Sequence, residues 1–270
     1  MKRAFALLAA VAVLGFGGKA FATPSTQIWI PSTDVQGFSV VHLGVDTYNT
    51  PFKGQTNGAN TEGGHNVINY GLTVGVLPND EKFGLEVGVD YRDFSLGGAK
   101  NPLLLNAKLG VKEGAFGEAM PAIAVGGYDF GTKSSSSATD AADFRTDYNI
   151  TYGLLAKSFE SIGRISVGYF SGNDKVLLDH NGDKANTGLL ASWDKSLSDK
   201  WWAAIDYMGG NSAYGALSFG ICYYVTPGAS MIFGYDIYND KDIGGKNLNG
   251  DTFTFQLDVN FDALSHPHHD

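Results

Sequence analysis

Apolar and polar residues alternate along most of this chain. The clearest segment, 83–92, has apolar residues at every odd position and glycine or charged residues between them: Phe83, Leu85, Val87, Val89 and Tyr91 against Gly84, Glu86, Gly88, Asp90 and Arg92. Successive side chains of a β-strand point to opposite faces, so this pattern gives a strand one apolar and one polar face. A helix would spread the same charges around its whole circumference. The segment therefore predicts a strand.

Twelve segments show this alternation, and an even number of strands is typical of antiparallel barrels in bacterial outer membranes. The sixth is expected to turn Tyr148, Ile150, Tyr152 and Leu154 outward. Pro121 cannot donate a ladder hydrogen bond, so it is expected to precede the fifth strand. The twelve segments are 41–46, 68–76, 83–92, 103–111, 121–128, 148–154, 165–169, 189–193, 201–207, 217–223, 231–237 and 251–261.

The predicted connections fall into two groups. One set is mostly long: 49–65, 95–102, 131–147, 171–187, 209–212 and 239–250. The other set is short: 78–82, 113–119, 158–163, 195–200 and 226–228. Membrane barrels have short periplasmic turns and longer external loops, whereas a soluble β-sandwich has no reason to sort its loops in this way. The fold class predicted is all-β, a transmembrane antiparallel up-and-down β-barrel of about twelve strands.

The first residues have the features of an export signal. Lys2 and Arg3 precede an apolar run over 4–17, and Ala20-Phe21-Ala22 matches the small-x-small pattern of a cleavage site. The run is too short for a membrane-spanning helix, which needs about 20 residues. We therefore predict four parts: a signal peptide 1–22, an N-terminal segment 23–37, a barrel 38–261 and a C-terminal extension 262–270. The segment 23–37 is expected either in the periplasm or inside the lumen as a partial plug.

Composition agrees with an exported barrel. The net charge is −9, and removal of Lys2, Arg3 and Lys19 makes it −12, which argues against nucleic acid as a partner. Cys222 is the only cysteine, so no intrachain disulfide can form. The chain combines 36 glycines with 13% aromatic residues. This pairing suits an apolar outer face and an inner face of small and polar side chains.

The last predicted strand, Asp251 to Phe261, alternates and ends in an aromatic residue. In this it resembles the C-terminal signal of bacterial outer-membrane β-barrel (porin-like) proteins, although that signal normally closes the chain and here Asp262 to Asp270 follow it. The resemblance is architectural. It implies a bacterial outer-membrane location, membrane lipid as a partner, and recognition by the barrel-assembly machinery through the strand that ends at Phe261.

The predicted inward charges are unevenly placed. Lys108, Lys112, Lys157 and Arg164 come from the fourth, sixth and seventh strands, whereas Asp46, Asp206, Asp236 and Asp258 come from the first, ninth, eleventh and twelfth. Barrel closure brings the acidic set together opposite the basic set, which favours a transverse field that orients polar solutes. The alternative is a set of structural salt bridges in a wet lumen. The remaining pore-lining candidates are His42, Glu86, Asp90 and Arg92.

Catalytic and metal-binding motifs are weak. His42 and Asp46 are four residues apart on one strand, about 13 Å, which is too far for direct contact. The oxygen-rich stretches 179–183 and 247–251 lack the spacing of an EF-hand, and the histidines of the tail 266–270 have no fixed geometry. We therefore predict no cofactor, no metal site and no enzymatic activity.

Twelve strands fall between a barrel filled by side chains and a wide aqueous channel. The predicted function is a narrow passive channel for ions or small polar solutes. Two alternatives remain open at this point. One is a closed scaffold that binds a partner through long external loops, and the other is a barrel enzyme that modifies membrane lipid.

Overall fold

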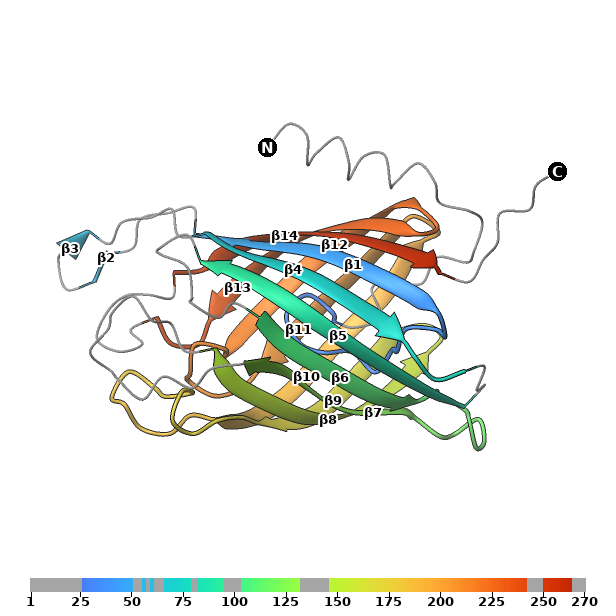
Figure 1. Ribbon diagram of the computed structural model, residues 1–270, viewed down its shortest axis with the longest axis horizontal. Coiled ribbons are helices and arrows are strands. Elements are labelled where there is room, and N and C mark those ends of the chain that lie inside the picture. Colours follow the sequence, from blue (N-terminus) through green and yellow to red (C-terminus); the bar gives the residue numbers. More distant parts are fainter. Residues whose placement is uncertain are drawn as a thin grey trace.

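The computed structural model describes residues 26–50, 55–56, 59–60, 66–78, 82–94, 103–131, 146–241 and 250–263. Twelve of its strands form one closed antiparallel barrel (Figure 1). Two short strands, β2 (Gln55–Thr56) and β3 (Ala59–Asn60), pair only with each other. The barrel strands are β1 (Val40–Asn49), β4 (Asn66–Gly75), β5 (Phe83–Phe94), β6 (Leu103–Val111), β7 (Ala122–Gly131), β8 (Asp147–Phe159), β9 (Gly163–Ser171), β10 (Thr187–Ser198), β11 (Trp201–Met208), β12 (Ala216–Thr226), β13 (Ala229–Tyr238) and β14 (Thr252–Asp262).

Closure comes from the first and last strands of the barrel. β1 pairs with β14 without a break, from Val40 opposite Asp262 to Asn49 opposite Phe253, and its other edge pairs with β4. Closure leaves no strand edge exposed, which a sheet needs when it crosses hydrocarbon. The predicted fold class and strand number are confirmed.

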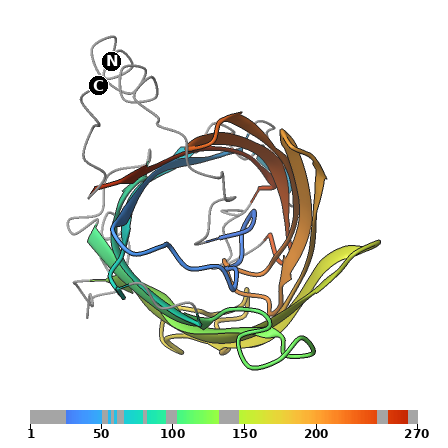
Figure 2. The same cartoon turned by 90° about the vertical axis from the view of Figure 1, so that its right-hand side faces the viewer.

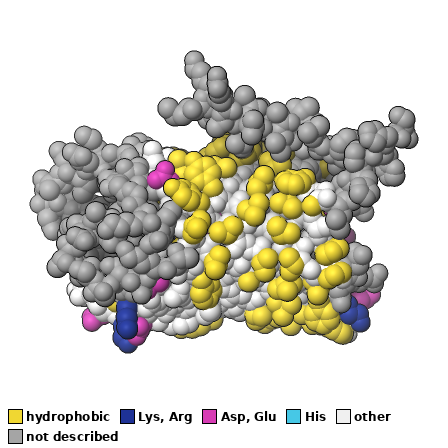
Figure 3. All heavy atoms as spheres, in the orientation of Figure 1, with side chains coloured by type: hydrophobic (Ala, Val, Ile, Leu, Met, Phe, Trp, Pro, Cys, Tyr) yellow, Lys and Arg dark blue, Asp and Glu magenta, His cyan; other side chains and the backbone are white. Residues whose placement is uncertain are grey.

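The outer face of the barrel carries a belt of exposed apolar side chains, visible in Figure 3. Members of this belt come from every barrel strand; examples are Leu43, Leu72, Val87, Leu105, Val125, Leu155, Val167, Leu189, Ile205, Phe219, Phe233 and Phe253. Such a surface is unstable in water and stable in lipid. The chain is therefore a transmembrane β-barrel of the outer-membrane type. Within the described ranges, no helix is long and apolar enough to cross a membrane.

The two ends of the barrel differ in their connections. At the turn end, β10–β11 and β12–β13 are joined by residues 199–200 and 227–228. At the loop end, on the left of Figure 1, β9–β10 and β11–β12 are joined by residues 172–186 and 209–215. This sorting confirms the pattern expected of an outer-membrane barrel. β7 begins directly after Pro121, as predicted.

One strand faces the opposite way from the prediction. Ile150, Tyr152 and Leu154 of β8 are buried inside the barrel, whereas Leu155 is exposed on the outer face. Both faces of β8 contain apolar residues, so alternation alone did not decide between them. Its Ile150, Tyr152 and Leu154 face inward because they pack in an apolar cluster inside the barrel.

Candidate functional site: the lumen and its N-terminal segment

Residues 26–37 lie inside the barrel and run across its lumen (Figure 2). Thr26 pairs with Pro31, and the N–H of Gln27 donates to the carbonyl of Ile30 at 2.8 Å, so the start of this segment folds into a tight turn. Its end joins β1 through Phe38, which pairs with Gly75. We call residues 26–37 the lumen segment. Of the two locations that the sequence left open, the structure has the lumen.

Two charged residues of the wall hold the backbone of the lumen segment. Asp206 Oδ2 accepts hydrogen bonds from the N–H groups of Ile28, at 2.8 Å, and Trp29, at 3.0 Å. On the opposite side, Glu86 Oε2 accepts one from the N–H of Gln36 at 2.8 Å. Hydrogen bonds to charged groups are stronger than those between neutral groups. The segment is therefore fixed near both of its ends.

Side chains of the wall add further polar contacts. Gln256 Nε2 donates to the carbonyl of Ile28 at 2.7 Å, and Lys108 Nζ donates to the carbonyl of Ser32 at 3.3 Å. Arg164 contacts the Asp34 carboxylate at 2.7 Å. These contacts come from β14, β6 and β9, so the segment is attached to several sides of the barrel.

Apolar packing fixes the turn of the lumen segment against one side of the wall. Ile30 is fully buried, and Ile28 is packed with Trp202, Ala204, Cys222 and Ile232. The Ile30 cluster comes from β7 to β11 and the β9–β10 loop: Ala124, Ile150, Tyr152, Leu154, Phe170, Leu177, Leu190 and Met208. Burial of Ile30 against these residues explains why β8 turns its apolar residues inward. The lumen is thus not uniformly polar.

Glycines of the wall make room for the lumen segment. A Cβ atom on Gly75 would lie 1.9 Å from the carbonyl oxygen of Gly37, and one on Gly110 would lie 2.5 Å from Val35 Cγ2. On the other side of the lumen, Cβ atoms on Gly220 and Gly234 would approach Ile28 to 2.9 and 3.0 Å. These glycines are therefore required by close contact with the segment.

Aromatic side chains surround Trp29 at the loop end of the lumen. The Trp29 ring lies 5.2 Å from that of Tyr48 and 5.7 Å from that of Tyr238, both edge to face. Its Nε1 donates to the carbonyl of Tyr214 at 2.8 Å. Edge-to-face contacts of this kind add to the free energy gained from burial. Trp29 therefore anchors the segment to the β11–β12 connection.

The basic residues that face the lumen are paired locally. Arg92 donates to both carboxylate oxygens of Asp129 at 2.8 Å, Lys108 lies 3.2 Å from Glu86, and Arg164 bonds Asp194 at 2.9 Å as well as Asp34. Of the pore-lining candidates, Arg92, Lys108, Arg164 and Glu86 thus belong to ion pairs. The basic residues of the predicted transverse field that face the lumen, Lys108 and Arg164, are therefore neutralised by neighbouring carboxylates.

Two predicted inward lysines lie elsewhere. Lys157 is opposite Ile165, whose side chain is on the outer face, and directly opposite residues share a face. It contacts Glu113 at 2.9 Å at the turn end. Lys112 is exposed just beyond the last residue of β6. The placement of Lys157 in the lumen was wrong because it followed from the inverted face of β8.

The lumen-facing acidic residues lack such partners. In the described ranges, no lysine or arginine forms an ion pair with Asp46, Asp206, Asp236 or Asp258, and Asp90 accepts hydrogen bonds only from Asn69 and Asn106. His42 lies 3.4 Å from Asp258 and contacts Asn260, not Asp46. The lumen as described therefore has more carboxyl groups than cationic groups.

Some functional residues were not singled out from the sequence. Alternation alone would have placed Asp194 in the lumen, because it follows outward Trp193. Asp129 was hidden because the β7–β8 register shifts beside it and its φ angle is 55°. Such an irregularity re-aims a side chain in a way that alternation does not reveal.

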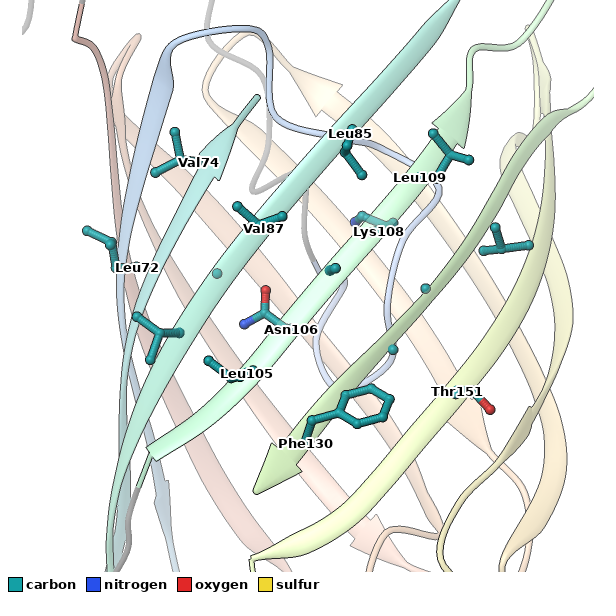
Figure 4. Close-up of a pocket in the computed structure, with 16 residues that line it drawn as sticks. Leu72, Val74, Leu85, Val87, Leu105, Asn106, Lys108, Leu109, Phe130 and Thr151 are labelled. Carbon is teal, nitrogen blue, oxygen red and sulfur yellow. The ribbon is translucent and has the colours of Figure 1, made fainter. Parts of the chain in front are cut away.

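A shallow pocket of about 990 Å³ lies on strands β4 to β8 (Figure 4). Most side chains that line it are outward and apolar, among them Leu72, Val87, Leu105 and Val125. It is therefore a depression in the lipid-facing belt and not part of the lumen.

Comparisons with known proteins give likenesses in structure only. No family model and no curated protein matches the chain. The solved COG4313 outer membrane channel from Pseudomonas putida F1 is 12% identical, and its alignment covers 90% of this chain and 100% of the channel, with a TM-score of 0.49. The KdgM porin is 8% identical, and its alignment covers 82% of this chain and 98% of the porin, with a TM-score of 0.44. The NanC porin is 13% identical, and its alignment covers 81% of this chain and 98% of the porin, with a TM-score of 0.43. At these identities the chain is not assigned to a family.

Proposed function

We propose that this protein is a narrow outer-membrane channel for ions and small polar solutes, and that the lumen segment forms its constriction. The observation that carries the proposal is the asymmetry of the lumen wall. The lumen segment packs its apolar turn on β7 to β13, whereas most inward residues of β1, β4, β5 and β6, apart from Leu104, are polar or glycine and include half-buried Asp46, Asp90 and Asn106. Water that crosses the barrel would follow this polar side.

The polar side carries hydrogen-bonding groups that suit a solute path. Glycine at 71 and 88 leaves room at the wall for these groups: a Cβ atom on Gly71 would lie 2.8 Å from Asp90 Oδ1, and one on Gly88 would lie 2.5 Å from Asn106 Oδ1. The carboxylates and amides there replace part of the hydration shell of a passing ion. The excess of carboxyl groups over cationic groups favours cations over anions of the same size.

A closed scaffold is the second candidate. Burial of Ile30 inside the barrel favours it, because an apolar cluster in the lumen stabilises the segment in place. Recognition of β14 by the assembly machinery stays a prediction, and it applies equally to both candidates.

Single-channel conductance in planar bilayers tests the proposal. The mature chain should conduct weakly, and a chain that lacks residues 26–36 should conduct more, because the constriction is gone. A third variant carries Ile28→Cys and Gly234→Cys in a Cys222→Ala background. The close approach of these positions suits a disulfide that locks the segment to β13. It should conduct no more than the mature chain when oxidised.

The results separate the candidates. Equal conductance with and without residues 26–36 would contradict a constriction by the segment. No conductance from the mature chain, together with an open pore after the deletion, would instead support the closed scaffold.

A further inference from the structure

A row of oxygen-bearing side chains crosses five neighbouring strands at one level of the lumen wall. Direct cross-strand pairing joins its members in register, from β9 to β13. We call these residues the oxygen row; they are Ser166, Ser192, Asp206, Ser218 and Asp236. Thr252 of β14 continues the row and donates to Asp236 Oδ2 at 2.8 Å.

All members of the oxygen row are more than nine-tenths buried. The hydroxyl oxygens of Ser166 and Ser192 and Oδ1 of Asp206 have no hydrogen-bond partner, whereas the Ser218 hydroxyl bonds the Asp236 carboxylate. Buried polar atoms in native structures are nearly always paired with protein, water or an ion. Three unpartnered oxygens beside a serine–aspartate pair therefore indicate a ligand.

The oxygen row is closed off from bulk water on both sides. Toward the loop end it is bordered by buried Leu190, Met208, Ala216 and Tyr238, and toward the turn end by the Arg164–Asp194 ion pair, Ala204, Gly220 and Gly234. Ile28 of the lumen segment lies against these two glycines. Two ionised carboxylates buried here would be strongly destabilising unless a cation or a proton neutralises them.

We propose that Asp206, Ser218 and Asp236 bind a hard divalent cation through their carboxylate and hydroxyl oxygens. Carboxylates, hydroxyls and water are the oxygen ligands that such ions prefer. Neighbouring strands are about 4.8 Å apart, so the backbones of Asp206 and Asp236 are about 10 Å apart with Ser218 between them. That span suits an ion that keeps part of its water shell. No described group of three or more His, Cys, Asp or Glu side chains is arranged for a metal, so hydroxyls and water must complete the shell.

The proposed cation also acts on the lumen segment. Asp206 offers Oδ1 to the ion while its Oδ2 accepts from Ile28 and Trp29. An ion at Oδ1 orients this carboxylate and so braces the turn of the segment. The site does not depend on whether the lumen conducts, and it adds a binding function to the channel proposed above.

Calcium chloride is the probe. Isothermal titration of the mature chain, refolded in a non-ionic detergent and freed of metal with a chelator, should show saturable binding. Asp236→Asn should weaken this binding at least tenfold, because the amide loses the charge. Ser218→Ala should weaken it by less. Asp236 is a better test than Asp206, because Asp206 accepts hydrogen bonds from the lumen segment whereas Asp236 accepts one from Thr252 of the wall.

Asp147→Asn is the matched control. Asp147 is another buried carboxylate, but its Oδ2 already accepts a hydrogen bond from Asn173 Nδ2 at 3.0 Å and it lies outside the oxygen row, so calcium affinity should not change. Heat-modifiable gel mobility confirms that each variant is folded, and Ser218→Ala serves if Asp236→Asn does not fold. Calcium should also slow hydrogen exchange of the Ile28 and Trp29 amides. No saturable binding by the mature chain, or an equal loss in Asp147→Asn, would overturn the site.

Discussion

The two sides of the lumen wall differ in the side chains that they turn inward. The wall from β7 to β11 is apolar around Ile30 and holds the lumen segment by burial, whereas β1, β4, β5 and β6 face the lumen with Asp46, Asp90, Asn106 and other polar groups. A barrel that is polar all around its interior would have no surface on which to seat an apolar turn. A single closed sheet can therefore hold an internal segment on its apolar side and keep a polar side for solutes.

The largest effect is expected on the apolar side, from Ile30→Asp. This change places a charge among apolar residues with no partner, which costs several kcal/mol, so the segment should leave its site. Chymotrypsin should then cut after Trp29 at least about tenfold faster, because a cost of about 1.4 kcal/mol already raises the population of the released segment tenfold. Mass spectrometry identifies the cut.

Ile30→Val is the control for this change. It removes one methylene and should cost only about 0.5–1.5 kcal/mol, so the segment should stay protected. If Ile30→Asp is cut as slowly as the unchanged chain, Ile30 is not what holds the segment.

A smaller effect is expected where the wall approaches the segment most closely. Gly75→Ala would place a methyl group 1.9 Å from the Gly37 carbonyl and should cost about 1–3 kcal/mol in the free energy of unfolding. Gly153→Ala is the matched change, because nothing lies within 4 Å of its Cβ position. Urea unfolding in lipid vesicles measures both. Equal effects would mean that Gly37 is not packed on β4.

On the polar side, Asp46→Asn should lower the preference for cations by roughly twofold, because it removes one uncompensated charge from the lumen. The reversal potential under a potassium chloride gradient measures this preference. Lys157→Gln should leave it unchanged, because Lys157 is on the outer face. An unchanged reversal potential in Asp46→Asn would count against a solute path along β1.

The smallest effect is expected at the turn end, outside both sides of the lumen. Burial of Glu113 opposes its ionisation, but Lys157 and Ser158 outweigh this and hold the pKa of Glu113 below its ordinary value. A lowered pKa in the folded state stabilises the fold above the ordinary carboxyl pKa, and this contribution is lost as the pH falls through the folded value. The pair is partly exposed, so Glu113→Gln should cost less than about 1 kcal/mol at pH 7.

Urea unfolding at pH 7 and at pH 3 tests this change, with Glu118→Gln as control. Lys157 contacts the backbone carbonyl of Glu118 and not its carboxylate, so this control should be neutral. A cost for Glu113→Gln that is as large at pH 3 as at pH 7 would show that its charge is not responsible.

Local sequence patterns are sufficient to predict the strands, the membrane barrel and the sorting of its connections. Alternation is a local property: in segment 83–92 the polarity of each residue predicts the face of the strand on which its side chain lies. The same holds for most of the other segments. Turn-forming and polar stretches mark the connections equally locally. For these features no distant contact is needed.

The face of β8, the partners of the lumen charges and the place of residues 26–37 depend on contacts between distant parts of the chain. Both faces of β8 are apolar enough to meet lipid, and the inward face is the one that packs with Ile30. Asp206 and Ile28 are 178 residues apart in the chain, so no local pattern joins them. The oxygen row likewise exists only through the register of five strands, which pairing across the closed sheet fixes.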